Sequence, residues 1–305
     1  MFQYRRLEDN SIIIFRKKDS DNSNVQKVNV LANNTCNTWQ EDRDYKEKVK
    51  NTSQGKLAED MFAGFVDAVQ HGKNKEFMYI PYDSFRDDDF EKHAPLDGIL
   101  CEIGNIHIEE GKKKILEDVK NNKYGTLTTQ TLEYLSKNKL FTVEVKSSKI
   151  PKRDYKRICV DKFSNLEEQK KLTKDLREKK DIITYPKLTR KKGLDIHDWE
   201  SYCKYAKENI PKYKDLDGNE LKESIISDEI KRNCDIHTRI FIDNTSTESE
   251  IGYLTGYALK SDIFKNPRII NMSQPGKSEN ALYFAYPIKD SMNLIELFND
   301  DRLWK

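Results

Sequence analysis

Two apolar segments that carry charged residues constrain the fold of this chain more than any other feature. The segment LFTVEVKSS, residues 140–148, is rich in aromatic and β-branched residues, as a strand is, yet it contains Glu144 and Lys146. The run PLDGILCEIG carries Asp97 near its start and fits a second buried strand. An unpaired charge in a buried strand costs on the order of several kcal/mol, which is comparable to the net stability of a whole domain. These charged residues are therefore either paired with each other or part of a functional site.

The surrounding pattern predicts an α/β fold with a central mixed sheet flanked by helices. The segment QGKLAEDMFAGFVDAVQHG has apolar residues at helical spacing and predicts an amphipathic helix that ends at Gly72. Further helices are expected at 109–138 and 167–180, and further strands at 237–244, 250–259 and 281–288.

The chain divides into a short extension and one large domain. Residues 1–53 are predicted to be a β-rich N-terminal extension, in which segments 11–18 and 25–32 form a hairpin. Residues 54–305 are predicted to form the main domain, with helical insertions at about 105–138 and 181–231.

Composition excludes several classes of protein. The 54 Lys and Arg nearly balance the 52 Asp and Glu, so a simple polybasic tail protein is excluded. Neither an apolar run of about 18 residues nor a secretory signal is present, and we expect a cytoplasmic protein. The five cysteines are an odd number without a CxxC pair, which favours reduced thiols over disulfides or structural zinc.

The charge is unevenly distributed along the chain. Residues 149–192 contain 16 Lys and Arg but only 7 Asp and Glu, so the middle is basic and the remainder acidic. Basic residues neutralise phosphates in a nucleic-acid backbone, although the helix at 167–180 is equally typical of a solvated face. The candidate DNA-binding residues follow the strand directly, and the two serines alternatively cap its end: Ser147, Ser148, Lys149, Lys152, Arg153, Lys156 and Arg157.

Asp97, Glu144 and Lys146 together suggest hydrolysis of phosphodiester bonds. Glu144 and Lys146 are two residues apart in one strand, so both point to the same face. Two carboxylates suit Mg²⁺, and a neighbouring lysine orients or deprotonates the attacking water. A structural Glu144–Lys146 ion pair is the alternative. Asp83 and the run at 87–89 are alternative acids, or else a solvated acidic loop.

The motif Pro95-Leu96-Asp97 followed by Glu144-Val145-Lys146 resembles the PD-(D/E)xK nuclease superfamily, and within it the bacterial type II restriction endonucleases. The resemblance implies an αβββαβ core. It also implies Mg²⁺ bound by Asp97, Glu144 and the carbonyl of Val145, with Lys146 as the catalytic lysine. The helix GKLAEDMF is similar to one that supplies an accessory acid, here Glu59.

The sequence departs from the family pattern at two points. Leu96 separates the proline from the aspartate, which are adjacent in the family. Asp97 and Glu144 are 47 residues apart, which requires a helical insertion between their strands. Both departures concern the match of Asp97 to the family motif more than that of Glu144 and Lys146.

The expected function is a Mg²⁺-dependent, sequence-specific endonuclease acting on double-stranded DNA, as a type II restriction enzyme does. A symmetric site favours a homodimer, and a cognate DNA methyltransferase would be a partner in the same system. Two alternatives stay open: a structure-specific or repair nuclease of the same fold, and a non-catalytic DNA-binding module with a degenerate nuclease core.

Overall fold

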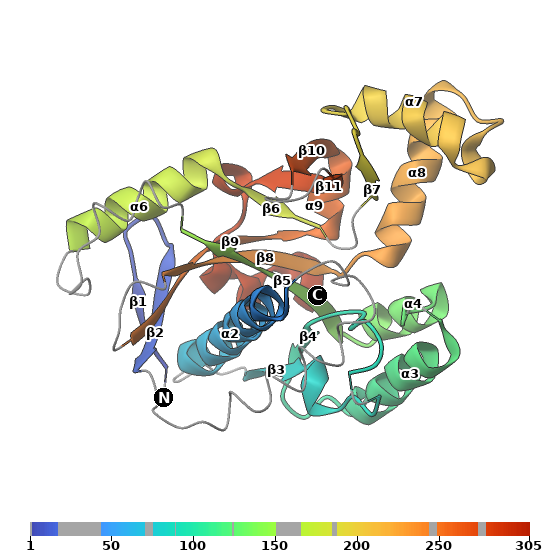
Figure 1. Cartoon of the computed structure of the whole chain (residues 1–305). Helices are drawn as coiled ribbons and strands as arrows, with labels where there is room; N and C mark the ends of the chain where they lie inside the picture. The colour runs from blue at the N-terminus through green and yellow to red at the C-terminus, as the bar shows by residue number, and fades with distance from the viewer. Residues whose placement is uncertain are drawn as a thin grey trace.

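A mixed seven-stranded sheet forms the centre of the protein, with helices on both faces (Figure 1). The computed structural model describes residues 2–17, 44–70, 76–88, 90–123, 125–150, 166–184, 188–243, 249–273 and 279–305. In order across the sheet, the strands are β1 (Gln3–Arg6), β2 (Ile12–Lys17), β9 (Ser249–Leu259), β8 (Ile236–Asp243), β5 (Phe141–Lys149), β4 (Gly98–Glu102) and β3 (Phe77–Pro81). The prediction of an α/β fold with a central mixed sheet is confirmed.

β5 and β8 form the parallel pair of this sheet, and the other neighbouring strands are antiparallel. Their register places Glu144 beside His237 and Lys146 beside Arg239. Parallel neighbours need a long crossover, and here the chain between them contains α6 (Leu166–Lys179), β6 (Asp181–Ile183), β7 (Thr189–Lys192), α7 (Trp199–Asn209) and α8 (Gly218–Arg232). The crossover brings β8 beside the charged strand β5.

Helix α2 (Tyr45–Gln70) covers one face of the central sheet. It begins earlier than its amphipathic segment because the preceding residues YKEKVKNTS contain no proline or glycine to stop it. Its buried side chains, among them Met61, Phe62 and Phe65, pack against Val143 and Val145 of β5. The same core includes residues of the C-terminal segments η5 (Leu294–Asn299) and α10 (Asp301–Trp304).

Two separate groups of elements cover the other face. Helices α3 (Ile108–Asn121) and α4 (Thr129–Lys137) pack on β3 and β4, so the predicted insertion at 105–138 is helical. Helix α6 packs with α7, α8 and a second sheet against residues of β2, β8 and β9. Alternation places Glu144 and Lys146 on this face, because Val143 and Val145 point toward α2.

The second sheet contains β10 (Arg268–Ser273), β11 (Glu279–Pro287) and β6, with β7 paired to β11 as well. The range 181–231 therefore contains strands as well as helices, and its strands pair with a segment about a hundred residues later. Helix α9 (Lys260–Lys265) connects β9 to this sheet. Helices α7 and α8 extend away from the central sheet (Figure 1).

The N-terminal hairpin differs from the prediction. β2 pairs with β1 on one side and with β9 on the other, so both of its edges are occupied. Segment 25–32, the expected partner, lies outside the described residues. Within the described residues, no helix is long and apolar enough to cross a membrane.

Candidate active site

Asp97 lies where β4 separates from β5. The two strands pair through Gly98–Leu100, and the Asp97 amide still donates to the Val143 carbonyl at 3.0 Å. One step further along β5, the Asp97 side chain replaces the backbone partner, because its Oδ2 accepts a hydrogen bond from the Val145 amide at 2.6 Å. The Asp97 carbonyl accepts from Tyr82 at 2.9 Å. Asp97 is therefore fixed against Val145, the middle residue of the segment Glu144-Val145-Lys146, called the EVK segment below.

Glu144, Val145 and Lys146 meet Asp97 at this separation. The amide and carbonyl of one strand residue point toward the same neighbouring strand, so the Val145 carbonyl points to the side where Asp97 lies. Glu144 is 6% exposed, and Lys146 Nζ lies 3.3 Å from its Oε1. The predicted acid, glutamate, carbonyl and lysine are thus brought together by β4 and β5.

Helix α2 contributes a second pair of charges. Lys56 Nζ lies 2.8 Å from Glu59 Oε2 and 2.7 Å from Asp83 Oδ2, and Asp83 belongs to the short helix η2 (Tyr82–Ser84). Arg86 also contacts Asp83, at 3.3 Å. Glu59, the predicted accessory acid, is buried beside Lys56, which precedes it by three residues, about one helical turn. Sequence reasoning did not identify Lys56.

The other alternative acids do not join the site. Asp88 pairs with Arg86, with Oδ1 2.7 Å from Nε, and accepts the Lys92 amide at 2.9 Å. Asp87 is exposed, and Asp89 lies outside the described residues. Asp83 is the alternative acid that the structure places beside the predicted residues.

Burial and mutual repulsion make these carboxylates hard to ionise. Burial, together with the charge of Asp97 and against the opposing effect of Lys146, raises the pKa of Glu144 to about 8. Burial also raises the pKa of Asp97 and, well above its ordinary value, that of Glu59. For Lys56, burial lowers the pKa, but Glu59 and Asp83 outweigh it and the net direction is upward. The carboxylates together outnumber the lysines among them.

The oxygen donors fit a magnesium ion. Within the described ranges, no group of three or more His, Cys, Asp and Glu side chains is arranged to hold a metal. Mg²⁺, however, keeps several waters and is commonly bound through one or two carboxylates. Asp97 and Glu144 supply two carboxylates, and the Val145 carbonyl supplies a third oxygen on the same side. A bound cation would also relieve the repulsion that raises the pKa of Glu144.

Tyr79 of β3 is a residue of this site that sequence reasoning missed. Its hydroxyl is buried and has no hydrogen-bond partner among the residues that the structure describes, and its ring packs edge-on against Phe62 with centroids 5.0 Å apart. Burial raises the pKa of Tyr79, and the charges of Asp97, Glu59 and Glu144 raise it further. The hydroxyl therefore lies within electrostatic reach of the carboxylates. Nothing in the sequence distinguishes it from the other tyrosines.

The predicted DNA-binding residues have different surroundings. Lys149 is exposed at the end of β5. Ser147 accepts a hydrogen bond from Gln54 of α2 at 3.2 Å, and Ser148 accepts one from Arg239 of β8 at 2.8 Å. Both hydroxyls therefore accept hydrogen bonds from other side chains of the protein. The remaining predicted residues lie outside the described ranges: Lys152, Arg153, Lys156 and Arg157.

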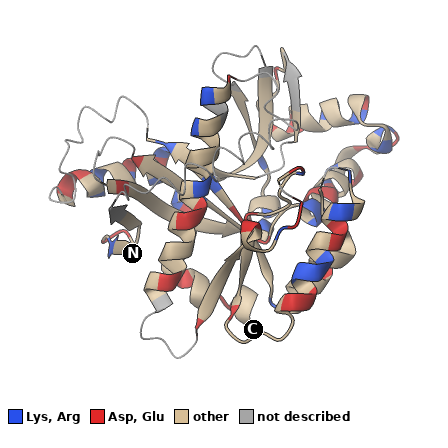
Figure 2. Ribbon diagram, turned by 60° about the horizontal axis from the view of Figure 1, so that its bottom comes forward, with Lys and Arg blue, Asp and Glu red and all other residues tan. Residues whose placement is uncertain are grey.

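Arg239 is a further cation near the EVK segment. It stands beside Lys146 in the sheet and also donates to the Asp181 carbonyl at 2.5 Å. Burial lowers the pKa of Arg239 to about 10. Elsewhere, Lys and Arg are interspersed with Asp and Glu along the helices in the view of Figure 2. Among the described residues, the positive charge near the site comes from individual half-buried side chains such as Lys56, Lys146 and Arg239.

Comparison of the chain with protein-family models, with curated proteins and with solved structures finds no match.

Proposed function

We propose that the protein is a Mg²⁺-dependent, sequence-specific endonuclease that hydrolyses phosphodiester bonds in double-stranded DNA, as type II restriction enzymes do. The observation that carries this proposal is the 2.6 Å hydrogen bond from the Val145 amide to Asp97 Oδ2. This bond joins the two halves of a motif that are 47 residues apart in sequence, and it places a carboxylate beside the glutamate and lysine of β5.

Each residue has a distinct role in this proposal. Asp97, Glu144 and the Val145 carbonyl would hold Mg²⁺, which when bound stabilises the negative charge that develops on the phosphate. Lys146 extends from the same face as Glu144 and would orient the attacking water and take part in its deprotonation. Glu59, held by Lys56, would serve as the accessory acid beside Asp97.

The partners follow from the same reaction. Lys149 continues β5 beyond Lys146 and is exposed, so it would contact a phosphate next to the cleaved one. Cleavage of both strands at a symmetric site favours a homodimer. A restriction enzyme would also require a cognate DNA methyltransferase that protects the same site.

One observation favours a second candidate function. Lys146 Nζ contacts Glu144 Oε1 at 3.3 Å, as expected for a structural ion pair within a degenerate nuclease core that binds DNA without cutting it. Such a module would bind DNA with a salt-sensitive affinity, and Mg²⁺ would not stimulate cleavage.

The test is incubation of the purified chain with unmethylated plasmids of known sequence, in Mg²⁺ or in EDTA, followed by mapping of the ends. Discrete fragments that require Mg²⁺ support the proposal. Lys146→Ala should abolish cleavage and retain binding, while Lys137→Ala, an exposed lysine on α4, should cut normally. Nicking or a smear would indicate a structure-specific nuclease instead. Intact plasmid would favour the binding module.

A further inference from the structure

Arg239 of β8 carries a positive charge that no carboxylate of the described residues contacts. Its Nε donates to Ser148 Oγ at 2.8 Å, and its Nη1 donates to the Asp181 carbonyl at 2.5 Å. Both of these acceptors are neutral. The Asp181 carboxylate is bound by Arg268 instead, whose Nη1 lies 2.9 Å from Oδ1. The fold therefore holds the Arg239 guanidinium in place without supplying a counter-ion from the part of the chain that the structure describes.

The other cations of the candidate site differ from Arg239 in this respect. Lys146 contacts Glu144, and Lys56 contacts Glu59. Arg239 is half-buried like them, and burial lowers its pKa to about 10 because water is removed from a charge that lacks a close partner. An unpaired charge that has lost water is unfavourable until an opposite charge reaches it. The position of Arg239 therefore favours an anionic ligand.

The register of β5 and β8 places Arg239 beside Lys146 on the same face of the sheet. Neighbouring strands are about 4.8 Å apart, so the two backbones are in immediate proximity. Asp97 meets β5 from the other neighbouring strand, β4, and contacts it at Val145. The contact of Nε with Ser148 shows that the guanidinium extends along β5 past Lys146. Lys146 therefore lies between the proposed metal ligands and Arg239.

The Nη2 atom of Arg239 is available to a ligand. It donates to no described residue and is not one of the buried polar atoms without a partner, so it reaches the surface of the protein. Ser148 and Asp181 hold the other two nitrogens, and the guanidinium carbon lies 5.1 Å from the centre of the Phe241 ring. An arginine that is fixed in advance loses little side-chain entropy on binding. Phosphate oxygens are among the anionic acceptors that a guanidinium binds best.

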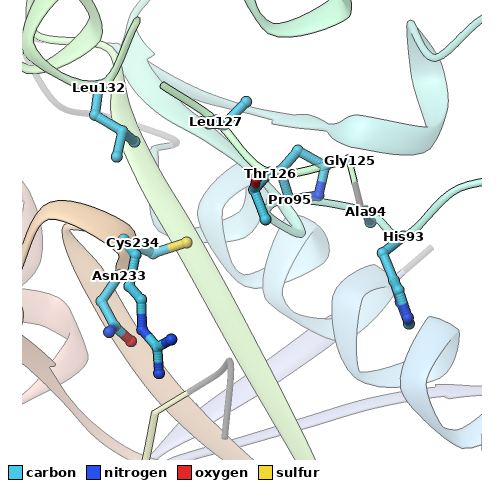
Figure 3. Close-up of a pocket in the computed structure, with 10 residues that line it drawn as sticks. His93, Ala94, Pro95, Gly125, Thr126, Leu127, Leu132, Asn233 and Cys234 are labelled. Carbon is cyan, nitrogen blue, oxygen red and sulfur yellow. The ribbon is translucent and has the colours of Figure 1, made fainter. Parts of the chain in front are cut away.

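The cavity beside Pro95 offers no comparable place for a phosphate (Figure 3). It has a volume of about 240 Å³, and Pro95, Leu127 and Leu132 form apolar parts of its wall. Arg232, which also lines it, is paired with Glu229, with Nε 2.7 Å from Oε2. A phosphate would lose its hydration against apolar walls without gaining a free cation. The β8 side of the site, rather than this cavity, therefore suits an anion.

We propose that Arg239 binds, through Nη2, a DNA phosphate that flanks the cleaved one. The inference rests on the proposed function, which supplies the DNA and places the cleaved phosphate at Asp97, Glu144 and Lys146. A DNA strand that runs from this point toward β8 brings a neighbouring phosphate to the guanidinium. Phosphate contacts fix the register and orientation of a protein on DNA and carry no sequence information. Arg239 therefore positions the cleaved bond at the metal ligands whatever the base sequence.

The first test measures the affinity of the full chain for a duplex oligonucleotide in EDTA at several salt concentrations, by fluorescence anisotropy. Arg239→Gln should reduce the magnitude of the slope of log K against log salt by about 1, because one phosphate contact contributes about 0.9. It should also weaken binding at least about tenfold at low salt. Arg239→Lys keeps the charge and should keep the slope. Arg6→Gln, the matched control, removes an exposed arginine of edge strand β1 and should change neither quantity.

Urea unfolding verifies that each variant is folded. A purely structural role for Arg239 would lower the stability of Arg239→Gln and leave its salt slope equal to that of the wild type, and this result would overturn the inference. Absence of DNA binding by the wild type would overturn it as well.

The second test replaces single phosphates around the mapped cleavage position with neutral methylphosphonates. At one flanking position the wild type should lose about as much affinity as Arg239→Gln loses on unmodified DNA, and the variant should lose no more. Equal losses for the two proteins at every position would contradict the contact.

The outcomes separate the two proposals. Mg²⁺-dependent cleavage with a salt slope that does not depend on Arg239 refutes this inference alone. A slope that depends on Arg239 in a chain that never cuts DNA refutes the proposed function and leaves the phosphate contact in place.

Discussion

The ring of Tyr79 packs on the bare backbone of Gly98: a Cβ at position 98 would lie 2.5 Å from Tyr79 Cε2 and 2.6 Å from its hydroxyl. Gly98 directly follows Asp97 and begins β4. The absence of a side chain at 98 therefore allows the hydroxyl to lie among the carboxylates. Gly98, which lies beside the candidate acid Asp97, thus determines the position of an aromatic side chain on β3, two strands away from β5.

Gly98→Ala should destabilise the protein by about 1–3 kcal/mol, because the methyl group overlaps the ring of Tyr79 and the core has to shift. Urea unfolding measures the change. Gly55→Ala, in helix α2, is the matched control, because no atom of the described part of the chain lies within 4 Å of the Cβ position. This control should raise the stability by up to about 1 kcal/mol. An equal effect of both substitutions would contradict the packing described for Tyr79.

Tyr79→Phe should leave the stability unchanged or slightly raised, since it removes a buried hydroxyl that has no partner. Urea unfolding curves of the wild type and the variant measure the change. A large loss of stability would show that the hydroxyl is bonded in the folded protein.

Glu144→Gln should stabilise the protein at pH 9 in the absence of divalent metal. The folded pKa of Glu144, about 8, is above the ordinary value of 4.5, so the folded state binds the extra proton between these values. The stability of the wild type therefore falls as the pH rises from 4.5 to 8. The variant should gain several kcal/mol at pH 9, at about 1.4 kcal/mol for each unit of pKa difference, and nothing near pH 4. A gain that is independent of pH would contradict this assignment.

Mg²⁺ binding should strengthen as the pH rises toward 9, because a protonated Glu144 cannot serve as a ligand and burial keeps its pKa at about 8. Isothermal titration calorimetry at several pH values, in buffers of different ionisation enthalpy, would measure both the affinity and the proton released. Constant affinity between pH 6 and 9 would exclude Glu144 as a ligand.

Lys56→Met should destabilise the protein by about 3 kcal/mol, because it leaves the buried carboxylate of Glu59 without its cation and leaves Asp83 with Arg86 alone. Adding Glu59→Gln should restore part of the loss, since it removes the unpaired charge at position 59. Urea unfolding of both variants provides the comparison. Equal losses in the single and double variants would show that the Lys56–Glu59 contact contributes little.

The strands that carry the site could be predicted because charge in an apolar segment is a local signal. Glu144 and Lys146 interrupt a β-branched run, and Asp97 precedes another. The structure forms strands at both and joins them through Val145. The helix that carries Glu59 could be predicted in the same way, from the helical spacing of its apolar residues.

The remaining parts of the site depend on contacts between segments that are distant in sequence. Lys56 is one of 54 basic residues, and only the approach of η2 to α2 pairs it with Asp83. In the sequence, Tyr79 belongs to an ordinary apolar strand, and its proximity to the site follows only from the packing of its ring on Gly98. The strands β6 and β7 are too short to show an alternating pattern, so their pairing with β11 could not be predicted.

The most direct test of the central claim compares the wild type with Asp97→Asn in cleavage of supercoiled plasmid at saturating Mg²⁺. The amide oxygen of asparagine can still accept from the Val145 amide, so the local fold should be retained while a metal ligand is weakened. We predict discrete fragments from the wild type and a rate at least about 100-fold lower for the variant, a loss of roughly 2.7 kcal/mol of transition-state stabilisation. Equal rates for the two proteins, or no cleavage of any plasmid by the wild type, would contradict the account.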